Sequence, residues 1–288
     1  MTAIAFLGTG LLGSAFVEAA VARGDTVTVW NRTPHKAQAL EAIGARFAAA
    51  PADAVREAER VYLVLKDDAV VNAVIEQCRE ALDPVAIIVD HSTTQPALTA
   101  ERARRLAAAG IRYLHCPVFI GPAMARKSQG TILASGPAAL FELVKEALQQ
   151  QAARVEYLGD RPDLAAVYKL CGNAFLIGIG ALVADMFAIG RGAEVEPLET
   201  LKPLEYLNLA AAVAGRGKNM AAGNFTASFE LTMARKDVQL MLETAAALPL
   251  AVLPGIAVRM DTLIAEGHGA LDLGVLSIRS LERFVALI

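Results

Sequence analysis

Two polar residues in an apolar stretch have the spacing and the chemistry for proton transfer. Lys169 and Asn173 are four residues apart inside residues 164–191, which we predict to form one long helix, so their side chains share a helix face. A lysine among apolar neighbours gives up its proton more readily than one in water, which suits it to act as a general acid or base. The alternative is a lysine at the wetter end of the helix with no chemical role.

A glycine pattern near the N-terminus predicts a dinucleotide-binding turn. Residues 4–7 form an apolar run of strand length, and a GxGxxG sequence follows directly, ahead of a helix over residues 12–23. The glycines permit a tight turn and the close approach of a pyrophosphate at the positive end of the helix. We expect the cofactor to contact the residues of this turn, which are Gly8, Thr9, Gly10, Leu11, Leu12 and Gly13.

The end of the second predicted strand, residues 26–30, favours NADP(H) over NAD as the cofactor. An NAD-preferring fold places Asp or Glu at this point for the ribose 2′-hydroxyl. This chain has Asn31, Arg32 and Thr33 instead. A guanidinium and a hydroxyl can bind a 2′-phosphate, which a carboxylate would repel. The alternative for Arg32 is an ordinary solvated charge.

The elements that must position these residues follow from hydrophobic periodicity. Strands alternate with helices as far as residue 162, which is typical of an α/β fold with a doubly wound parallel sheet of the Rossmann type. From Asp163 onward only helical periodicity follows. We therefore predict an NADP-binding domain over residues 1–162 and an all-α domain over 163–288. Predicted strands are 4–7, 26–30, 61–65, 85–89, 111–114, 131–134 and 155–158, and predicted helices after 162 are 164–191, 199–214, 227–247, 251–266 and 273–287.

Ligands bind such folds at the carboxyl ends of the strands, so the residues that follow the strands are candidates. Leu65 and Lys66 are expected to approach the cofactor. Ser92, Thr93 and Thr94 come after another strand, and their hydroxyls either bind a ligand or cap the next helix. We assign Thr93 to the cofactor and Ser92 to the substrate.

An apolar segment over residues 115–122 is predicted to be an irregular loop that forms a wall of the ligand site. Within it, Phe119, Ile120 and Gly121 are expected to contact the substrate. Lys236 lies in the later helical region beside Asp237, and either belongs to a site or is part of a solvated charged face.

Composition excludes several classes of protein. The net charge of −3 and the lack of a basic cluster argue against nucleic-acid binding. The four histidines are scattered, so we predict no metal site. A strand begins within three residues of the N-terminus, and the three cysteines have no CxxC spacing, which favours a cytoplasmic protein. The apolar residues 174–190 are too few for a membrane span, and we expect that helix to be buried against the second domain or a partner subunit.

Six motifs in order along the chain resemble the β-hydroxyacid dehydrogenase family, which includes 3-hydroxyisobutyrate dehydrogenase and glyoxylate/succinic semialdehyde reductases. The resemblance implies a carbonyl reductase or dehydrogenase with NADP in the first domain and a homodimer or higher homo-oligomer formed through the second. It also implies that Lys169 is the general acid/base, that Asn173 orients the substrate and Lys169, and that Lys236 contacts the cofactor. The motifs are residues 8–13, 90–93, 116–121, Lys169 with Asn173, residues 236–237 and residues 267–272.

One departure from the family concerns the substrate. The family usually has Ser-Gly-Gly after Pro-Val to bind a carboxylate, and this chain has Phe119, Ile120 and Gly121, which favours a more apolar carbonyl compound. The related imine reductases share residues 30–34 and 165–168 but usually have aspartate or tyrosine in place of Lys169. Imine reduction is therefore the first alternative, and an NADP-binding regulatory protein without turnover is the second.

Overall fold

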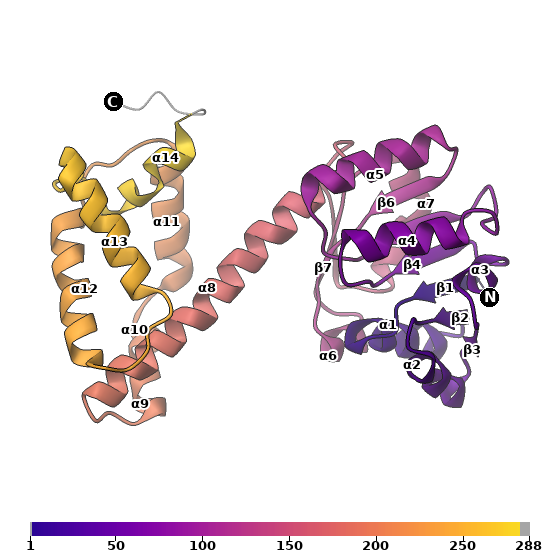
Figure 1. Cartoon of the computed structure of the whole chain (residues 1–288), viewed down its shortest axis with the longest axis horizontal. Coiled ribbons are helices and arrows are strands. Elements are labelled where there is room, and N and C mark those ends of the chain that lie inside the picture. The colour runs from indigo at the N-terminus through magenta and orange to yellow at the C-terminus, as the bar shows by residue number, and fades with distance from the viewer. Residues whose placement is uncertain (1, 283–288) are drawn as a thin grey trace. The chain divides into compact units, whose positions relative to one another are not determined.

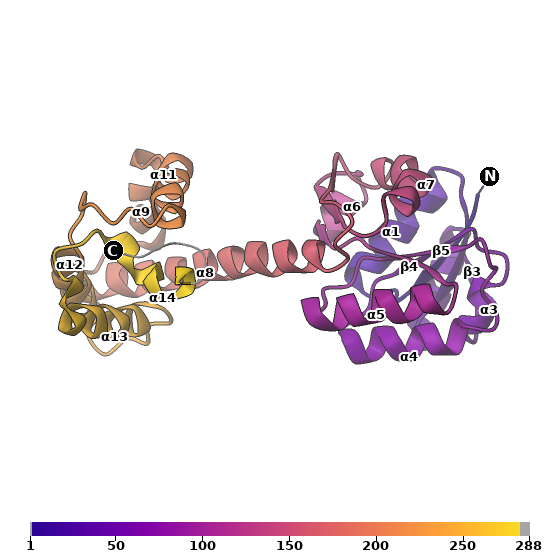
Figure 2. The same ribbon diagram turned by 90° about the horizontal axis from the view of Figure 1, so that it is seen from above.

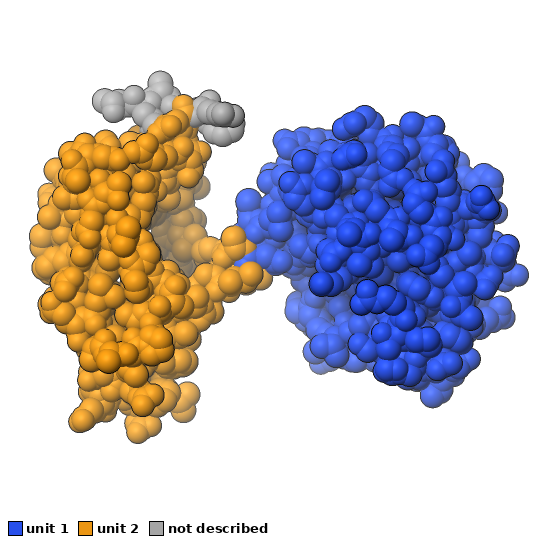
Figure 3. Space-filling view, in the orientation of Figure 1, with its two compact units in different colours: residues 1–173 blue, residues 174–288 orange. Residues whose placement is uncertain are grey.

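The chain divides into two compact units, shown in different colours in Figure 3. The computed structural model describes residues 2–282, and contacts separate Met1–Asn173 from Ala174–Ile288. The sequence placed the division at residue 162, before the long helix α8 (Leu164–Gly192) begins. The contacts place it inside α8, so Lys169 and Asn173 both belong to the first unit.

The first unit is built on a six-stranded, all-parallel sheet (Figure 1). Its order is β3-β2-β1-β4-β5-β6, which confirms the predicted doubly wound fold. Five strands begin and end within two residues of the predicted bounds, whereas the two-residue β3 is too short to show a pattern. The strands are β1 (Ala3–Leu7), β2 (Thr26–Trp30), β3 (Arg46–Phe47), β4 (Arg60–Leu63), β5 (Ile87–Asp90) and β6 (Arg112–His115).

Helices cover both faces of this sheet (Figure 2). In β1, Ile4 and Phe6 pack in a core with α1, while Ala5 and Leu7 pack in a second core with α4 on the other face. A strand buried on both faces must be apolar throughout, as this one is. The helices on the first face are α1 (Leu11–Ala22), α6 (Pro122–Ala125) and α7 (Ala138–Gln149), and those on the second are α3 (Pro51–Val55), α4 (Asp68–Cys78) and α5 (Pro96–Ala108), with α2 (Pro34–Gln38) and η1 (Ala39–Ile43) after β2.

A second, three-stranded sheet follows, made of β7 (Val118–Phe119), β8 (Thr131–Ala134) and β9 (Arg154–Tyr157). The prediction that residues 115–122 are irregular throughout is wrong, because Phe119 pairs antiparallel with Thr131. Gly130 makes this pairing possible, since its φ is +90° and a Cβ there would lie 2.7 Å from the Phe119 carbonyl oxygen.

The second unit is helical, as predicted, around a core that includes Leu231, Val238 and Met260. The single helix predicted over residues 199–214 is wrong. The chain breaks there at Pro203, which has no amide to donate, and Asn208 starts a new helix by accepting from the Ala211 amide. The elements are α9 (Pro197–Leu201), α10 (Pro203–Tyr206), α11 (Leu209–Ala221), α12 (Leu231–Ala245), α13 (Leu253–Leu263), η2 (Ile264–His268), η3 (Leu273–Ser277) and α14 (Ile278–Leu281). The last predicted helix, 273–287, extends beyond the described residues.

The long helix α8 has an exposed apolar middle. In the single chain Phe175, Leu176 and Ile177 are 51%, 58% and 71% exposed. By length and composition alone α8 could cross a membrane, a test that core helices of soluble proteins also pass. Burial of this stretch against a partner subunit stays a prediction. Further along, Asp185 accepts from the amides of residues 251–253 and thereby caps α13.

Candidate active site

The glycine turn between β1 and α1 has the shape that the sequence predicts. Gly8 has a φ of +104°, and a Cβ at Gly13 would lie 1.9 Å from the Gly8 carbonyl oxygen, so both positions require glycine. A Cβ at Gly10 would meet nothing within 4 Å. Gly10 therefore leaves open space in front of the α1 N-terminus, which is where a pyrophosphate would lie.

This turn opens onto a cavity of about 700 Å³. The lining brings together ten of the predicted cofactor residues, while Thr9 beside them is buried and its hydroxyl has no hydrogen-bond partner among the described residues. The open backbone, the cavity and the unpaired hydroxyl fit a dinucleotide. The ten are Gly8, Gly10, Leu11, Leu12, Gly13, Asn31, Arg32, Thr33, Leu65 and Lys66.

Asn31 has a role in the turn that sequence reasoning missed. Its Oδ1 accepts from the Thr9 amide at 3.1 Å, and its Nδ2 donates to the Thr33 carbonyl at 3.0 Å. The side chain therefore joins the glycine turn to the end of β2, which fixes both against each other.

Two further residues of the cavity were also missed. Trp30, the last residue of β2, and Lys36, on α2, both line it. Lys36 adds a third cation to Arg32 and Lys66 at this cavity. The sequence could have indicated Lys36, because it lies in the first turn of the helix that begins at Pro34, two residues after Arg32.

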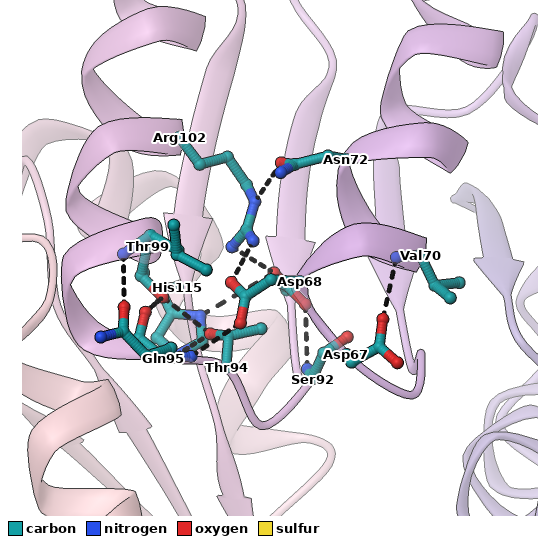
Figure 4. Close-up of polar contacts among 12 residues, drawn as sticks. Asp67, Asp68, Val70, Asn72, Ser92, Thr94, Gln95, Thr99, Arg102 and His115 are labelled. Atoms are coloured by element: carbon teal, nitrogen blue, oxygen red, sulfur yellow. Dashed lines mark hydrogen bonds and ion pairs between the residues drawn. The ribbon is translucent and has the colours of Figure 1, made fainter.

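A buried network at the end of β5 fixes the segment that contains Ser92, and Figure 4 shows part of it, with Ser92, Asp68 and Arg102 labelled. Asp90 is fully buried and accepts from the Ser92 amide at 2.9 Å and from the Tyr113 hydroxyl at 2.7 Å. Arg102 lies 3.8 Å from the same carboxylate and also pairs with Asp68. Burial by itself would raise the pKa of Asp90, but His115, Ser92 and Arg102 outweigh burial and keep this pKa below its usual value.

The three hydroxyls after β5 have separate environments. Ser92 is buried and its Oγ accepts from the Leu65 amide at 3.0 Å, so the loops after β4 and β5 are joined. Thr93 is exposed, and Thr94 bonds Thr99 at 2.7 Å. None caps the next helix, because the Gln95 side chain does so. Substrate contact for Ser92 and cofactor contact for Thr93 stay predictions.

Lys169 and Asn173 are brought together on α8. The Lys169 side chain donates from Nζ to Asn173 Oδ1 at 2.9 Å, and Lys169 is only 9% exposed. Burial lowers the pKa of the Lys169 ammonium below its usual value. The Phe119 ring lies beside the ammonium, with its centroid 4.4 Å from Nζ. Lys169 is therefore neither at a wet end of the helix nor without a partner, and its chemical role stays a prediction.

The start of α8 is fixed at the carboxyl edge of the main sheet by Ser135. The Ser135 backbone bridges His115, the last residue of β6, and its Oγ accepts from the Ala165 amide at 3.0 Å. Lys169 follows Ala165 by one helical turn. Because the glycine turn also follows the carboxyl end of its strand, the sheet presents both sets of residues at the same edge.

Lys236 belongs to the second unit, on α12, where its Nζ pairs with Asp237 at 2.7 Å. Its predicted contact with the cofactor stays a prediction. No group of three metal-ligating side chains is found among residues 2–282.

Known proteins resemble this chain along most of its length. An uncharacterized oxidoreductase from Shewanella frigidimarina is 28% identical over 253 residues, which cover 85% of this chain and 86% of that protein. The human cytokine-like nuclear factor N-PAC is 27% identical over 243 residues. That match covers 83% of this chain and 44% of N-PAC, so the chain spans less than half of that relative.

Two solved structures have a similar fold over nearly the whole chain. The imine reductase from Myxococcus stipitatus in complex with NADP+ has a TM-score of 0.87 and is 23% identical, covering 96% of this chain and 99% of that one. The reductive aminase from Aspergillus terreus in complex with NADPH4, cyclohexanone and allyl amine has a TM-score of 0.84 and is 25% identical, covering 97% and 99%.

A protein-family model matches the first half of the chain. Residues 3–159 match the NAD binding domain of 6-phosphogluconate dehydrogenase. Since these residues are more than half of the chain, it belongs to this family of NAD(P)-binding oxidoreductases, which is also that of the β-hydroxyacid dehydrogenases and the imine reductases.

Proposed function

We propose that the protein is an NADP-dependent reductase of small apolar carbonyl compounds and that Lys169 is its general acid. The observation that carries this proposal is the environment of Lys169, a nearly buried ammonium that donates to Asn173 in a chain with a dinucleotide-binding turn. When bound, the reduced nicotinamide would supply hydride to the carbonyl carbon. Lys169 would donate its proton to the carbonyl oxygen, and Asn173 would orient the Lys169 ammonium.

The cations around the cavity support NADP over NAD. Arg32, Lys36 and Lys66 all line the cavity, and the side chains of Arg32 and Lys36 are exposed. An NAD-binding site would place a carboxylate after β2, where this chain has Asn31. We therefore propose that Arg32 and Thr33 bind a 2′-phosphate.

The apolar segment beside Lys169 supports an apolar substrate. Phe119 and Ile120 are half-buried, and neither side chain offers a hydrogen bond. A substrate carboxylate at this segment would lose hydrogen bonds that water gives it, at about 1 to 3 kcal/mol for each unmet partner. We propose that aldehydes or ketones without a carboxylate are better substrates than glyoxylate.

The test is NADPH oxidation by the purified protein against semialdehydes, apolar aldehydes and ketones, glyoxylate, and cyclic imines. Lys169→Ala should lower kcat for carbonyl reduction by about 10²- to 10⁴-fold, the usual contribution of a general acid. Lys145→Ala is the matched control, because Lys145 is a lysine on α7 whose only ion-pair partner in the described part is Glu142 on the surface. Unchanged turnover by Lys169→Ala would refute the catalytic role, and a much higher kcat/KM on glyoxylate would refute the apolar substrate.

Imine reduction is the second candidate, favoured by the similarity to the reductive aminase and imine reductase structures. Turnover of cyclic imines alone would select it. A regulatory protein without turnover is the third, and NADPH binding with no activity on any substrate would select that one. We also propose a cytoplasmic homodimer or higher homo-oligomer that binds neither membrane nor nucleic acid, with the exposed apolar middle of α8 as the contact between subunits.

A further inference from the structure

The ring of Phe119 lies between two residues of α8 that are three positions apart. Its centroid is 4.4 Å from Lys169 Nζ, within the range of a cation–π interaction. Its outer edge meets Gly172, where a Cβ would lie 2.3 Å from Phe119 Cζ and 2.7 Å from Cε1. No side chain larger than hydrogen fits at residue 172 while the ring stays in this place.

We propose that Phe119 is a positioning residue that holds the Lys169 ammonium, and that Gly172 is the residue that admits its ring; this inference rests on the role of Lys169 proposed above. The ring itself is fixed by the backbone. Phe119 belongs to β7, which pairs with β8 opposite Thr131, and Gly130 has no Cβ to press on the Phe119 carbonyl oxygen.

Both partners of the ammonium are neutral. The Asn173 Oδ1 and the Phe119 π face each favour the protonated form of Lys169, and each opposes the effect of burial. The ring therefore stabilises the protonated form of Lys169, a role that a carboxylate partner would fill at an ordinary buried lysine. Leucine at residue 119 would keep apolar volume beside the ammonium but remove this π face.

No neighbouring charge explains the lowered pKa of Lys169. Burial is the cause of its lowered pKa, and no charged group among the described residues contributes. This holds for the titratable residues on α8, just before it and on the segments around Phe119, which are Asp163, Tyr168, Cys171, Asp185, Arg191, His115, Cys116, Arg126 and Lys127.

The direct test measures the protonation of Lys169 without turnover. Acetic anhydride acylates only the neutral amine, so the extent of acylation at each lysine, read by mass spectrometry over a pH series, gives the midpoint for that lysine. Phe119→Leu should lower the Lys169 midpoint by about 0.4 to 1.5 pH units, the equivalent of the lost cation–π interaction. Lys145, whose Nζ is 5.8 Å from the unchanged Phe141 ring, is the internal reference and should not move.

A double-mutant cycle tests the fit between the ring and the helix. Gly172→Ala favours the helix by its propensity, so the variant should fold, but it displaces the ring and should lower kcat at unchanged NADPH affinity. In the Phe119→Leu background the same substitution should have no further effect on kcat. Gly180→Ala, on the same helix with nothing within 4 Å of its Cβ, should leave the Lys169 midpoint unchanged.

The outcomes separate this inference from the proposed function. A Lys169 midpoint that stays or rises in Phe119→Leu overturns the positioning role, even if Lys169→Ala is inactive. Additive losses of kcat in the double variant overturn the role of Gly172. If no substrate is turned over, the proposed function fails, and the acylation midpoints still decide whether Phe119 holds the ammonium.

Discussion

Two glycines of the β1–α1 turn should respond in opposite ways to the same substitution. At Gly13 an alanine Cβ would lie 1.9 Å from the Gly8 carbonyl oxygen, so backbone would have to move by about 1.5 Å to restore normal contact. Overpacking of this kind lowers the free energy of unfolding by about 1 to 3 kcal/mol or more. The higher helix propensity of alanine offsets up to about 1 kcal/mol of this loss. We expect Gly13→Ala to lose about 2 kcal/mol of unfolding free energy.

Gly10→Ala should leave stability unchanged and weaken cofactor binding. Gly10 has an extended backbone, with φ −72° and ψ −169°, and open space at its Cβ, so the folded state accepts alanine within about 0.5 kcal/mol. The methyl group would fill the space through which a pyrophosphate approaches the backbone. We expect NADPH affinity to fall at least tenfold, which is about 1.4 kcal/mol.

One fluorophore reports binding without any need for activity. Trp30 is the only tryptophan in the sequence and lines the cavity, so its quenching should follow NADPH binding. Urea unfolding followed by circular dichroism gives the stability, and Gly255→Ala, with nothing within 4 Å of its Cβ, is the control for the substitution itself. Wild-type affinity in Gly10→Ala would show that the turn does not hold the pyrophosphate as proposed, and wild-type stability in Gly13→Ala would refute the steric need for glycine beside the Gly8 carbonyl.

Three further predictions concern specificity, stability and assembly. Arg32→Ala should weaken NADPH about tenfold and leave NADH unchanged by Trp30 quenching, and equal losses for both would contradict a 2′-phosphate site. Asp90→Asn should lower the free energy of unfolding by about 3 kcal/mol at neutral pH, measured by urea unfolding. The pKa of Asp90 is lower in the folded state, so its carboxylate stops stabilising the fold as the pH falls through the folded pKa. Plotted against pH, the unfolding free energies of the wild type and the variant should therefore converge in acid. Ile177→Lys should yield monomers by light scattering if α8 joins the subunits, and an unchanged mass would exclude this surface.

The sequence predicted the parts of the fold that depend on local patterns. The strand, glycine turn and helix of residues 4–23 are correct because each glycine meets a local steric need, at Gly8 for its positive φ and at Gly13 for its contact with Gly8. The predicted contact between Lys169 and Asn173 is present because four-residue spacing on one helix brings the two side chains together, whereas their catalytic roles stay a prediction.

The parts that depend on distant residues could not be predicted. Strand β7 exists because Gly130 turns the chain back toward Phe119, and two paired residues leave no periodic pattern. Ser92 is a candidate ligand residue because it carries a hydroxyl. That hydroxyl accepts from the Leu65 amide, a contact that forms only because the sheet brings the loops after β4 and β5 together. The sequence predicts Phe119 as part of an apolar wall of the ligand site. Its contact with Gly172 could not be predicted, because it depends on how α8 packs against the second sheet.

The charge at the site bears on which of the two chemistries it favours. Lys169 has no ion-pair partner among the described residues, and its two partners, Asn173 and Phe119, carry no charge. If Lys169 keeps its proton as proposed, its positive charge would stabilise the oxyanion that develops as a carbonyl is reduced. The same charge would repel a protonated imine, because water screens like charges little at a nearly buried position. A ring that keeps the proton on Lys169 would therefore favour carbonyl over imine reduction.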